Sequence, residues 1–305
     1  VGQHLVCKGG TSLSKAWKLM ERFSEDIDLA LYRAFLGFEG DISGKAVKKL
    51  RKASNEFLTK TFLPALQQKF EEKGFRDVKL EMIEESQDES KEEDIPIEEP
   101  VKIFINYKEI TTHPAYIAPR VQFEIGSRSL REPFSYQKLG SLLDETLPYS
   151  DFAEEPIRIP VVNPDRTFLE KVFLLHEEFH KPIEKIRVHR LSRHIYDVYH
   201  LSKEKFAYKA IHDQELYETI VAHRHKFSRV GQVDYNSLNP IYINPIPITE
   251  VIGDWEKDYQ RMKDEMIYEA NPPTFKELIE TLEVLREKIS KVDWTFELKF
   301  PIPNS

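Results

Sequence analysis

Two aspartates, Asp26 and Asp28, are separated by one residue and alternate with apolar side chains at Ile27, Leu29 and Leu31. This period-two alternation is typical of a half-buried β-strand, and it directs both carboxylates to one face. Neighbouring carboxylates repel each other, so an ionised pair generally needs a bound cation, and hard oxygen ligands suit Mg²⁺ or Mn²⁺. The pair therefore indicates a metal site. The alternative, a solvated strand edge, does not explain why the flanking residues look buried.

A turn of small residues precedes the acidic pair, at Gly9, Gly10, Thr11 and Ser12. A short strand is expected before it, over residues 4–8. A helix is expected after it, because apolar residues recur at helical spacing, at Leu13, Ala16, Trp17 and Met20. Small residues and free backbone N–H groups at a helix start can hold a phosphate, although such residues also cap helices that bind nothing. Together with the carboxylates, the turn predicts a compact site for a metal ion and a nucleoside triphosphate.

Three more residues are candidates for the same site. Glu124 lies between apolar residues of a strand expected over residues 121–125 and would be a third metal ligand, but alternation alone also predicts a polar residue there. Lys171 lies in an apolar helix, where its charge needs an anion such as a triphosphate unless the side chain snorkels to the surface. Asp197 is similarly placed among apolar residues, and it could instead pair with Arg193, one turn earlier.

The segment His176-Glu177-Glu178-Phe179-His180 matches the H-E-x-x-H pattern of zinc peptidases. No third ligand follows at metalloprotease spacing, and short motifs also arise by chance in charged helices. We therefore interpret the match as coincidental and keep a zinc peptidase as an alternative.

The elements that must position these residues form an α+β fold. Further strands are expected over residues 78–83, 101–107 and 121–125, and together with the earlier strands they predict one mixed sheet. A long helical stretch is expected over residues 47–70, interrupted by Pro64 and ending near Gly74. Carboxylates crowd residues 84–99, which predicts a solvated hairpin tip or disordered insertion; mimicry of an anionic partner is the alternative.

The second half of the chain has helical periodicity. Helices are expected around residues 167–179, 191–201, 216–221, 251–267 and 275–289. We therefore expect a mixed-sheet core domain over residues 1–160 and a helical domain over residues 161–305, which would contribute Lys171 and Asp197.

Composition limits the class of protein. Of the 305 residues, 40% are hydrophobic and 31% charged, a balance that favours an ordinary globular protein over a disordered one. No apolar run approaches the roughly 18 to 20 residues of a membrane span. The single cysteine, Cys7, cannot form an internal disulfide and is expected to be a buried strand residue, so a reducing cytoplasm is the expected location. The chain begins at Val1 without a methionine, and a natural upstream segment is expected.

The net charge of −8 argues against broad, non-specific coating of nucleic acid, which depends on neutralising phosphates. Basic residues nevertheless outnumber acidic ones between Lys171 and Lys209, as an RNA-binding face would require. They include Lys181, Lys185, Arg187, Arg190, Arg193, Lys203, Lys205 and Lys209. A charge-balanced helical surface is the alternative.

Two ordered motifs, KGGTSL at residues 8–13 and RFSEDIDL at residues 22–29, resemble the AbiEii-type toxin nucleotidyltransferases of bacterial abortive-infection and toxin–antitoxin systems. The resemblance covers residues 8–201 and implies a polymerase-β-like nucleotidyltransferase core followed by a helical C-terminal part. It also implies that Lys171 and Asp197 complete the site, with Glu124 as the third acid. Two features depart from the family: His194 stands where relatives often have an acidic residue, and the helical segment that usually precedes the glycine turn is absent.

The resemblance implies metal-dependent transfer of a nucleoside monophosphate from a nucleoside triphosphate to an acceptor hydroxyl, with tRNA as the acceptor and a cognate antitoxin as partner. The catalytic residues would be Asp26, Asp28, Lys171 and Asp197. Nucleotide would be bound by Gly9, Gly10, Thr11, Ser12 and Lys171, and Mg²⁺ or Mn²⁺ by Asp26, Asp28 and Glu124. Two alternatives stay open: a small molecule or protein as the acceptor, and a non-catalytic interaction protein with the same fold.

Overall fold

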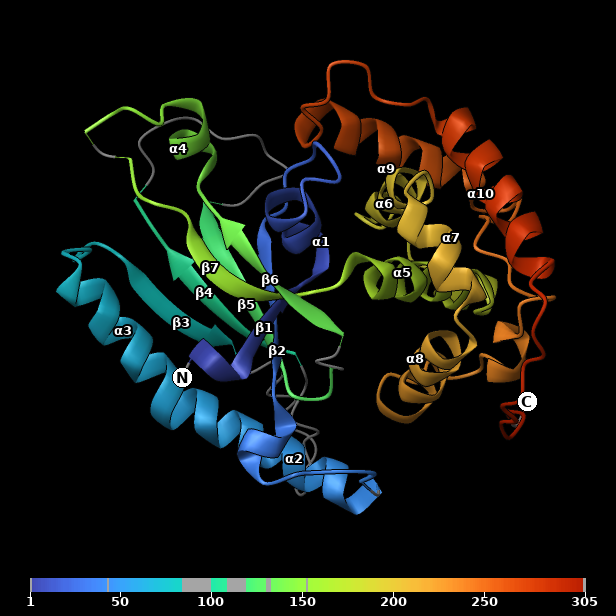
Figure 1. Cartoon of the computed structure of the whole chain (residues 1–305), viewed down its shortest axis with the longest axis horizontal. Helices are drawn as coiled ribbons and strands as arrows, with labels where there is room; N and C mark the ends of the chain where they lie inside the picture. Colours follow the sequence, from blue (N-terminus) through green and yellow to red (C-terminus); the bar gives the residue numbers. More distant parts are fainter. Residues whose placement is uncertain are drawn as a thin grey trace. The chain divides into compact units, whose positions relative to one another are not determined.

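The computed structural model describes residues 2–42, 44–83, 100–108, 119–129, 133–151 and 153–303. The chain divides into two compact units, whose elements are labelled in Figure 1. The first unit contains residues 1–16 and 24–162, and the second contains residues 17–23 and 163–305. The chain therefore leaves the first unit after Ala16 and returns to it at Ser24. The acidic segment at residues 84–99 lies outside the described residues.

Within the described residues, the first unit is built on a seven-stranded sheet with the order β3-β4-β5-β2-β1-β7-β6. The strands are β1 (Leu5–Lys8), β2 (Asp26–Leu31), β3 (Lys79–Ile83), β4 (Val101–Asn106), β5 (Arg120–Gly126), β6 (Phe134–Leu139) and β7 (Ile157–Val162). The pairs β2–β5 and β1–β7 are parallel, and the other neighbours are antiparallel. The predicted α+β class and mixed sheet are thus confirmed. The last two strands, β6 and β7, were not predicted.

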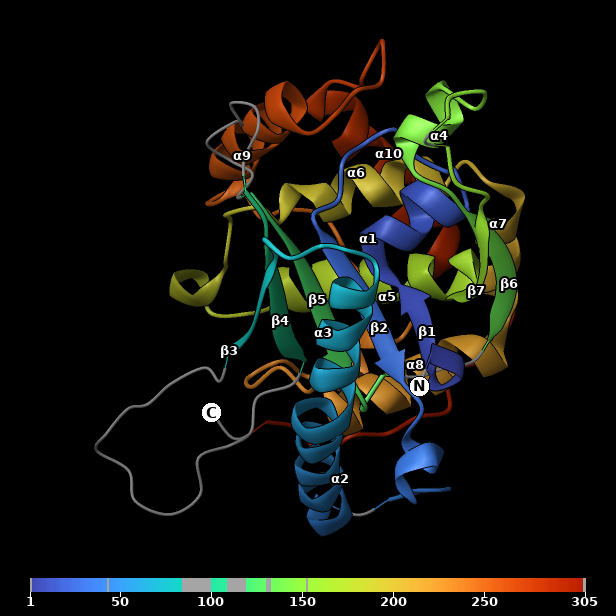
Figure 2. The ribbon, with the colours of Figure 1, turned by 90° about the vertical axis from the view of Figure 1, so that its left-hand side faces the viewer.

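One face of the sheet packs against a long helical segment, which runs along the strands in Figure 2. This segment consists of α2 (Gly44–Phe57), a π-helical turn (Leu58–Phe62) and α3 (Leu63–Glu72). Burial of apolar side chains holds the two layers together; the core residues are Leu5, Leu31, Leu58, Phe62, Val101, Ile103 and Ile125. The α-helical stretch is interrupted next to Pro64, as predicted: the π-helical turn ends at Phe62, and the proline lies in the first turn of α3, where its missing N–H is tolerated.

The opposite face of the sheet, which we call the carboxylate face, carries the predicted acids. Residues paired across neighbouring strands direct their side chains to the same face, so the strand register arranges them in rows. One row runs across β1, β2, β5 and β4 and contains Lys8, Asp28, Glu124 and Lys102. The adjacent row, on β2, β5 and β4, contains Asp26, Gln122 and Phe104. Another part of this face is an apolar cluster, at Val6, Ala30, Phe134 and Val162.

The second unit is helical, as the periodicity predicts. Its helices are α5 (Pro164–Phe179), α6 (Ser192–Leu201), α7 (Lys205–His212), α8 (Gln214–Phe227), α9 (Ile252–Glu265) and α10 (Phe275–Ser290). Helix α5 is central: it packs against α6, α7 and α8, and most of its residues are buried. A helix buried on most sides can carry charged residues only where each has a partner. Among the helices that the structure describes, none has the length and apolar character of a membrane span.

The remaining helical segments are short. They are α1 (Gly9–Thr11), a π-helical turn (Ser12–Ala16), α4 (Leu142–Thr146) and 3-10 turns at Gly2–His4, Arg33–Leu36, Ile183–Lys185 and Tyr235–Leu238. The helix predicted after the glycine turn therefore ends at Ala16, and Trp17 and Met20 lie outside it. Lys18 takes a left-handed φ of 53°, which redirects the chain at this point.

Candidate active site

The glycine turn and the acidic pair lie against each other. Strand β1 ends at Lys8, and Gly9 follows with a φ of +71°, in the left-handed region that favours glycine. A Cβ atom at Gly9 would lie 1.9 Å from Oδ2 and 2.7 Å from Cγ of Asp28. The Asp28 carboxylate thus packs directly on the backbone of the turn.

Hydroxyl groups fasten the turn to its surroundings. Thr11 donates its side-chain hydroxyl to the backbone carbonyl of Asp26, the first residue of β2. The buried Ser12 donates its Oγ to the carbonyl of Gly9 at 2.8 Å. Both hydroxyls therefore shape the turn, and contact with a phosphate would come from backbone N–H groups.

Three carboxylates gather on the carboxylate face. Asp26 and Asp28 are two residues apart on β2, and Asp28 is paired in register with Glu124 on β5. Burial raises the pKa of Glu124, and the negative charges of Asp28 and Asp26 raise it further. On the other side of Asp28, the Nζ atom of Lys8 lies 3.7 Å from its Oδ1. The three acids therefore repel one another, and Lys8 offsets part of that repulsion.

The residues fit a divalent ion that also uses ligands from its substrate. As the side chains stand, the described part of the chain contains no group of three or more His, Cys, Asp or Glu placed to hold a metal ion. Glu124 instead accepts a 2.7 Å hydrogen bond from Nε2 of Gln122. Mg²⁺ commonly takes one or two carboxylates, with phosphate and water oxygens as its other ligands. Asp26 and Asp28 match that donor set, and Glu124 is near enough to add its charge.

The second unit contains a buried ion cluster around Asp197. The Nζ atom of Lys171 on α5 lies 2.8 Å from Oδ2 of Asp197 on α6. Arg22 donates from Nε to Oδ1 at 2.6 Å and from Nη2 to Oδ2 at 2.7 Å, a bidentate geometry typical of strong pairs. All three side chains are buried. Asp197 therefore pairs with Arg22 and Lys171, and the alternative pairing with Arg193 is wrong.

The segment that carries Arg22 is anchored within the same unit. The backbone N–H of Phe23 donates to Met266 at 2.7 Å, and that of Tyr268 donates to Glu21 at 3.0 Å. Arg22 was not predicted as a site residue. Its only signal in the sequence is its position at the start of the RFSEDIDL motif, because its partner lies 175 residues away.

The groups of the cluster shift one another's pKa values. Although burial alone would raise the pKa of Asp197, Arg22 and Lys171 hold it well below its ordinary value, so the carboxylate stays ionised. Burial lowers the pKa of Lys171, and Asp197 offsets part of that effect. The Nδ1 atom of His194 lies 3.4 Å from Nζ of Lys171. Burial and the nearby Lys171 charge hold the pKa of His194 well below 6.5, so this ring is neutral and can accept a hydrogen bond from the ammonium group.

Several basic residues of the predicted RNA-binding face already have partners. Lys181 and Arg187 both pair with Glu178, each at 2.7 Å. Lys185 donates to Gln232 at 2.7 Å, and the ammonium group of Lys203 lies 3.5 Å from the ring centroid of Tyr199. The excess of positive charge is therefore partly neutralised within the unit.

The H-E-x-x-H segment has a structural role in this fold. Nδ1 of His176 accepts the backbone N–H of Asn244 at 2.9 Å, and its Nε2 lies 2.8 Å from Oγ of Ser237. Glu177 forms a buried ion pair with Arg224. Because both nitrogens of His176 are engaged, neither offers a lone pair to zinc. These contacts argue against the zinc-peptidase alternative.

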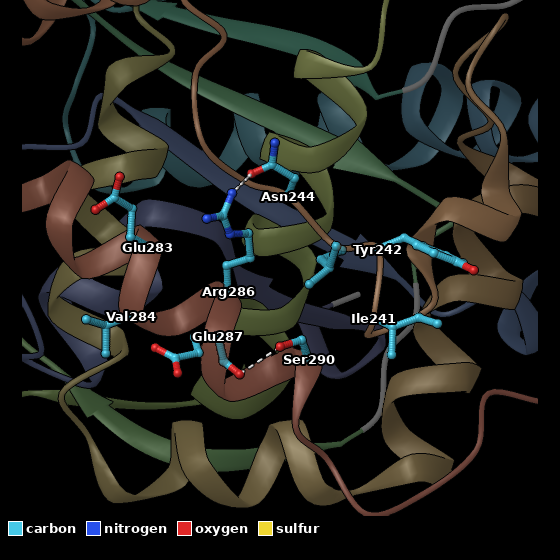
Figure 3. A pocket seen from close by; sticks show the side chains of 9 residues that line it. Ile241, Tyr242, Asn244, Glu283, Val284, Arg286, Glu287 and Ser290 are labelled. Carbon is cyan, nitrogen blue, oxygen red and sulfur yellow. Dashed lines mark hydrogen bonds between the residues drawn. The ribbon is translucent and has the colours of Figure 1, made fainter.

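A cavity of about 890 Å³ lies beside α10 in the second unit (Figure 3). Its lining includes Ile241, Tyr242 and Asn244 from one loop and Glu283, Arg286 and Glu287 from the helix. Arg286 points toward Asn244, 3.5 Å away. None of the predicted site residues lines this cavity.

Comparison with known proteins gives one family. The model of the family described as "Nucleotidyl transferase AbiEii toxin, Type IV TA system" matches residues 1–281. No curated protein matches the chain. Solved structures that resemble it include MenT4, a nucleotidyltransferase toxin from Mycobacterium tuberculosis H37Rv, with 15% identity, a TM-score of 0.42 and coverage of 93% of this chain and 85% of that one. JHP933 from Helicobacter pylori has 14% identity, a TM-score of 0.35 and coverage of 94% and 84%. Since the family match spans nearly the whole sequence, the chain belongs to the AbiEii nucleotidyltransferase toxins of type IV toxin–antitoxin systems.

Proposed function

We propose that this nucleotidyltransferase uses Mg²⁺ or Mn²⁺ to transfer a nucleoside monophosphate from a nucleoside triphosphate to a tRNA hydroxyl. The observation that carries the proposal is the contact of the Asp28 carboxylate with the backbone of Gly9. This contact joins the two requirements of the chemistry, because carboxylates suit the divalent ion and the turn suits the phosphates.

Each residue has a role that follows from its surroundings. Asp26 and Asp28 would hold the ion, and Glu124 would add negative charge beside it. When bound, the ion would neutralise phosphate charge and favour ionisation of the attacking hydroxyl. Gly9, Gly10, Thr11 and Ser12 would present backbone N–H groups to the phosphates.

Lys171 is proposed to neutralise charge on the leaving pyrophosphate. Two contacts support this role, because Asp197 and His194 together fix the position of its ammonium group. Asp197 would be a positioning residue, and Arg22 would keep it ionised. A buried cluster with two cations and one carboxylate has an excess positive charge that favours an incoming anion.

Family membership and local charge support the proposed antitoxin and acceptor. Family membership supports a cognate antitoxin that restrains the activity. The basic residues between Lys171 and Lys209 support RNA as the acceptor, although several of them have partners within the unit. Binding of tRNA should weaken as salt rises if these residues contact phosphates.

The decisive experiment supplies each labelled nucleoside triphosphate with total RNA, Mg²⁺ and either the natural chain or its Asp28→Asn variant. We expect one nucleotide to become covalently attached to tRNA, and the variant to lose this transfer while it stays folded. Asp254→Asn is the matched control, because this exposed carboxylate pairs with Lys257 on the same helix. An active Asp28→Asn variant would contradict the metal role, and label appearing only in protein or small molecules would exclude the tRNA acceptor.

A further inference from the structure

We infer that Arg120 and Phe104 form a stacking platform for the terminal nucleobase of the acceptor strand. The Cζ atom of Arg120 lies 3.8 Å from the centroid of the Phe104 ring. Phe104 is buried, whereas Arg120 is exposed. The inference rests on the proposed nucleotide transfer, and it assigns a binding role to two residues outside the predicted site.

The platform lies on the carboxylate face, on β5 and β4, and β5 is the strand next to the acidic pair on β2. Phe104 shares a row with Asp26 and Gln122, and Arg120 precedes Gln122 by two residues on β5. Strand spacing and rise place the Cα atoms of Phe104 and Arg120 about 8 to 10 Å from that of Asp26. A nucleotide spans a comparable distance between its sugar hydroxyl and the far edge of its base. A hydroxyl at the carboxylates therefore leaves its own base within reach of Arg120.

In-line chemistry determines which nucleotide can use this platform. The attacking oxygen and the leaving pyrophosphate lie on opposite sides of the phosphorus atom that is transferred. The glycine turn follows β1, on one side of β2, whereas β5 and β4 lie on the other side. If the leaving phosphates lie on the turn, the acceptor approaches over β5 and β4, where Arg120 and Phe104 lie. The base that stacks there is consequently the acceptor's.

The chemistry of the pair suits an unpaired base. Bases of single-stranded RNA stack on aromatic rings and on guanidinium planes, and such stacking tolerates any base. One side of the Arg120 guanidinium lies over Phe104, which restrains its orientation through a cation–π contact. Within the described residues Arg120 forms no ion pair, so no carboxylate there competes for the guanidinium.

A purely structural role makes a different prediction. If Arg120 only covers Phe104, its removal should affect every acceptor equally. A stacking role makes the effect of Arg120 depend on whether the acceptor has a terminal base. The test therefore compares two RNA hairpins with a single-stranded 3′ end, one complete and one with an abasic terminal ribose.

Binding of the two fluorescent hairpins is measured by anisotropy in the Asp28→Asn background and without nucleoside triphosphate, so that no transfer takes place during the measurement. We expect the chain with Arg120 to prefer the complete hairpin by about 5- to 100-fold, the range that base stacking supplies. Arg120→Ala and Arg120→Lys should both abolish this preference, since lysine keeps the charge but lacks the plane. Affinity for the nucleoside triphosphate should stay the same.

Arg158→Ala is the matched control, because Arg158 lies 5.0 Å from the ring centroid of Tyr136 on the same face, in rows away from the carboxylates. It should keep the preference for the complete hairpin. Equal weakening of both hairpins by Arg120→Ala, or weaker binding of the triphosphate in place of RNA, would overturn the inference. Nucleotide transfer is assayed separately in the chain that keeps Asp28. Failure of the stacking test while this transfer is observed would contradict the inference and not the proposed function.

Discussion

Gly9→Ala tests whether the glycine turn and the acidic pair act together. The added Cβ would lie 1.9 Å from Oδ2 of Asp28, 2.7 Å from its Cγ and 3.0 Å from its Cβ. To reach an ordinary contact of 3.4 Å, the Asp28 carboxylate must retreat by about 1.5 Å. Displacements of about 1 Å in catalytic geometry can lower rates about 100-fold, so we expect at least this loss of nucleotide transfer.

The same substitution has a separate cost in stability. Alanine in the left-handed region costs about 1 to 2 kcal/mol, whatever surrounds it. Gly74→Ala isolates this cost, because Gly74 has a φ of +85° and a Cβ there would meet nothing within 4 Å. Gly74→Ala should therefore melt about 2 to 8 °C lower, if the unit unfolds as domains of its size do, and Gly9→Ala, which also displaces Asp28, should melt at least as much lower.

The assay measures nucleotide transfer at saturating Mg²⁺ and the melting temperature of the three proteins. Gly74→Ala should keep its transfer rate, and Gly9→Ala should lose it at a temperature where both are folded. Transfer by Gly9→Ala at the rate of Gly74→Ala would refute the idea that the turn fixes the position of Asp28. Loss of transfer in both variants would show that backbone strain alone disturbs the enzyme.

Three further predictions concern ionisable side chains. Asp197→Asn leaves the buried Arg22 and Lys171 without their anion, so it should lower the free energy of unfolding, measured by urea titration, by about 3 to 5 kcal/mol. In the natural chain, the stability that Asp197 contributes is fully present above its unfolded pKa, near 3.8, and declines as the pH falls below that value. A change under 1 kcal/mol would count against this ion cluster. Burial holds the pKa of His176 well below 6.5, so the free energy of unfolding should fall as the pH drops below 6.5, by up to about 1.4 kcal/mol per pH unit. His176→Gln should make the plot of this free energy against pH less steep. Glu124→Gln removes the repulsion of Glu124 by Asp26 and Asp28, so the metal-free protein should have a higher melting temperature. The variant should also need a higher Mg²⁺ concentration for half-maximal transfer. An unchanged dependence on Mg²⁺ would show that Glu124 does not act at the metal site.

Local patterns predicted the parts of this protein that depend on neighbours along the chain. Alternation at Asp26 and Asp28 correctly indicated a strand with both acids on one face, because side-chain direction in a strand follows from backbone geometry alone. The helices of the second unit followed from their periodicity in the same way, except α7, which was not predicted. Strand β7 was not predicted, because Pro160 interrupts its pattern. The strand tolerates this proline, since its pairing with β1 is limited to Val161.

Contacts between distant residues could not be predicted. Nothing near Asp197 in the sequence indicates Arg22, and the cation–π contact of Arg120 with Phe104 depends on the register of two strands. The contact of Gly9 with Asp28 was anticipated only as proximity, from the short spacing between the motifs. That Asp26, Asp28, Glu124, Lys171 and Asp197 serve catalysis stays a prediction until the variants are measured.

The route of the chain limits how this toxin can be dissected genetically. Residues 17–23 belong to the second unit, although they come before most of the first. A fragment that begins at Asn163 would therefore lack Arg22. Its buried Lys171 and Asp197 would pair with each other without the arginine that also binds Asp197 in the whole chain. Splitting the gene before Asn163 should therefore destabilise the C-terminal half, whereas coexpressing a peptide of residues 17–23 with it should restore folding.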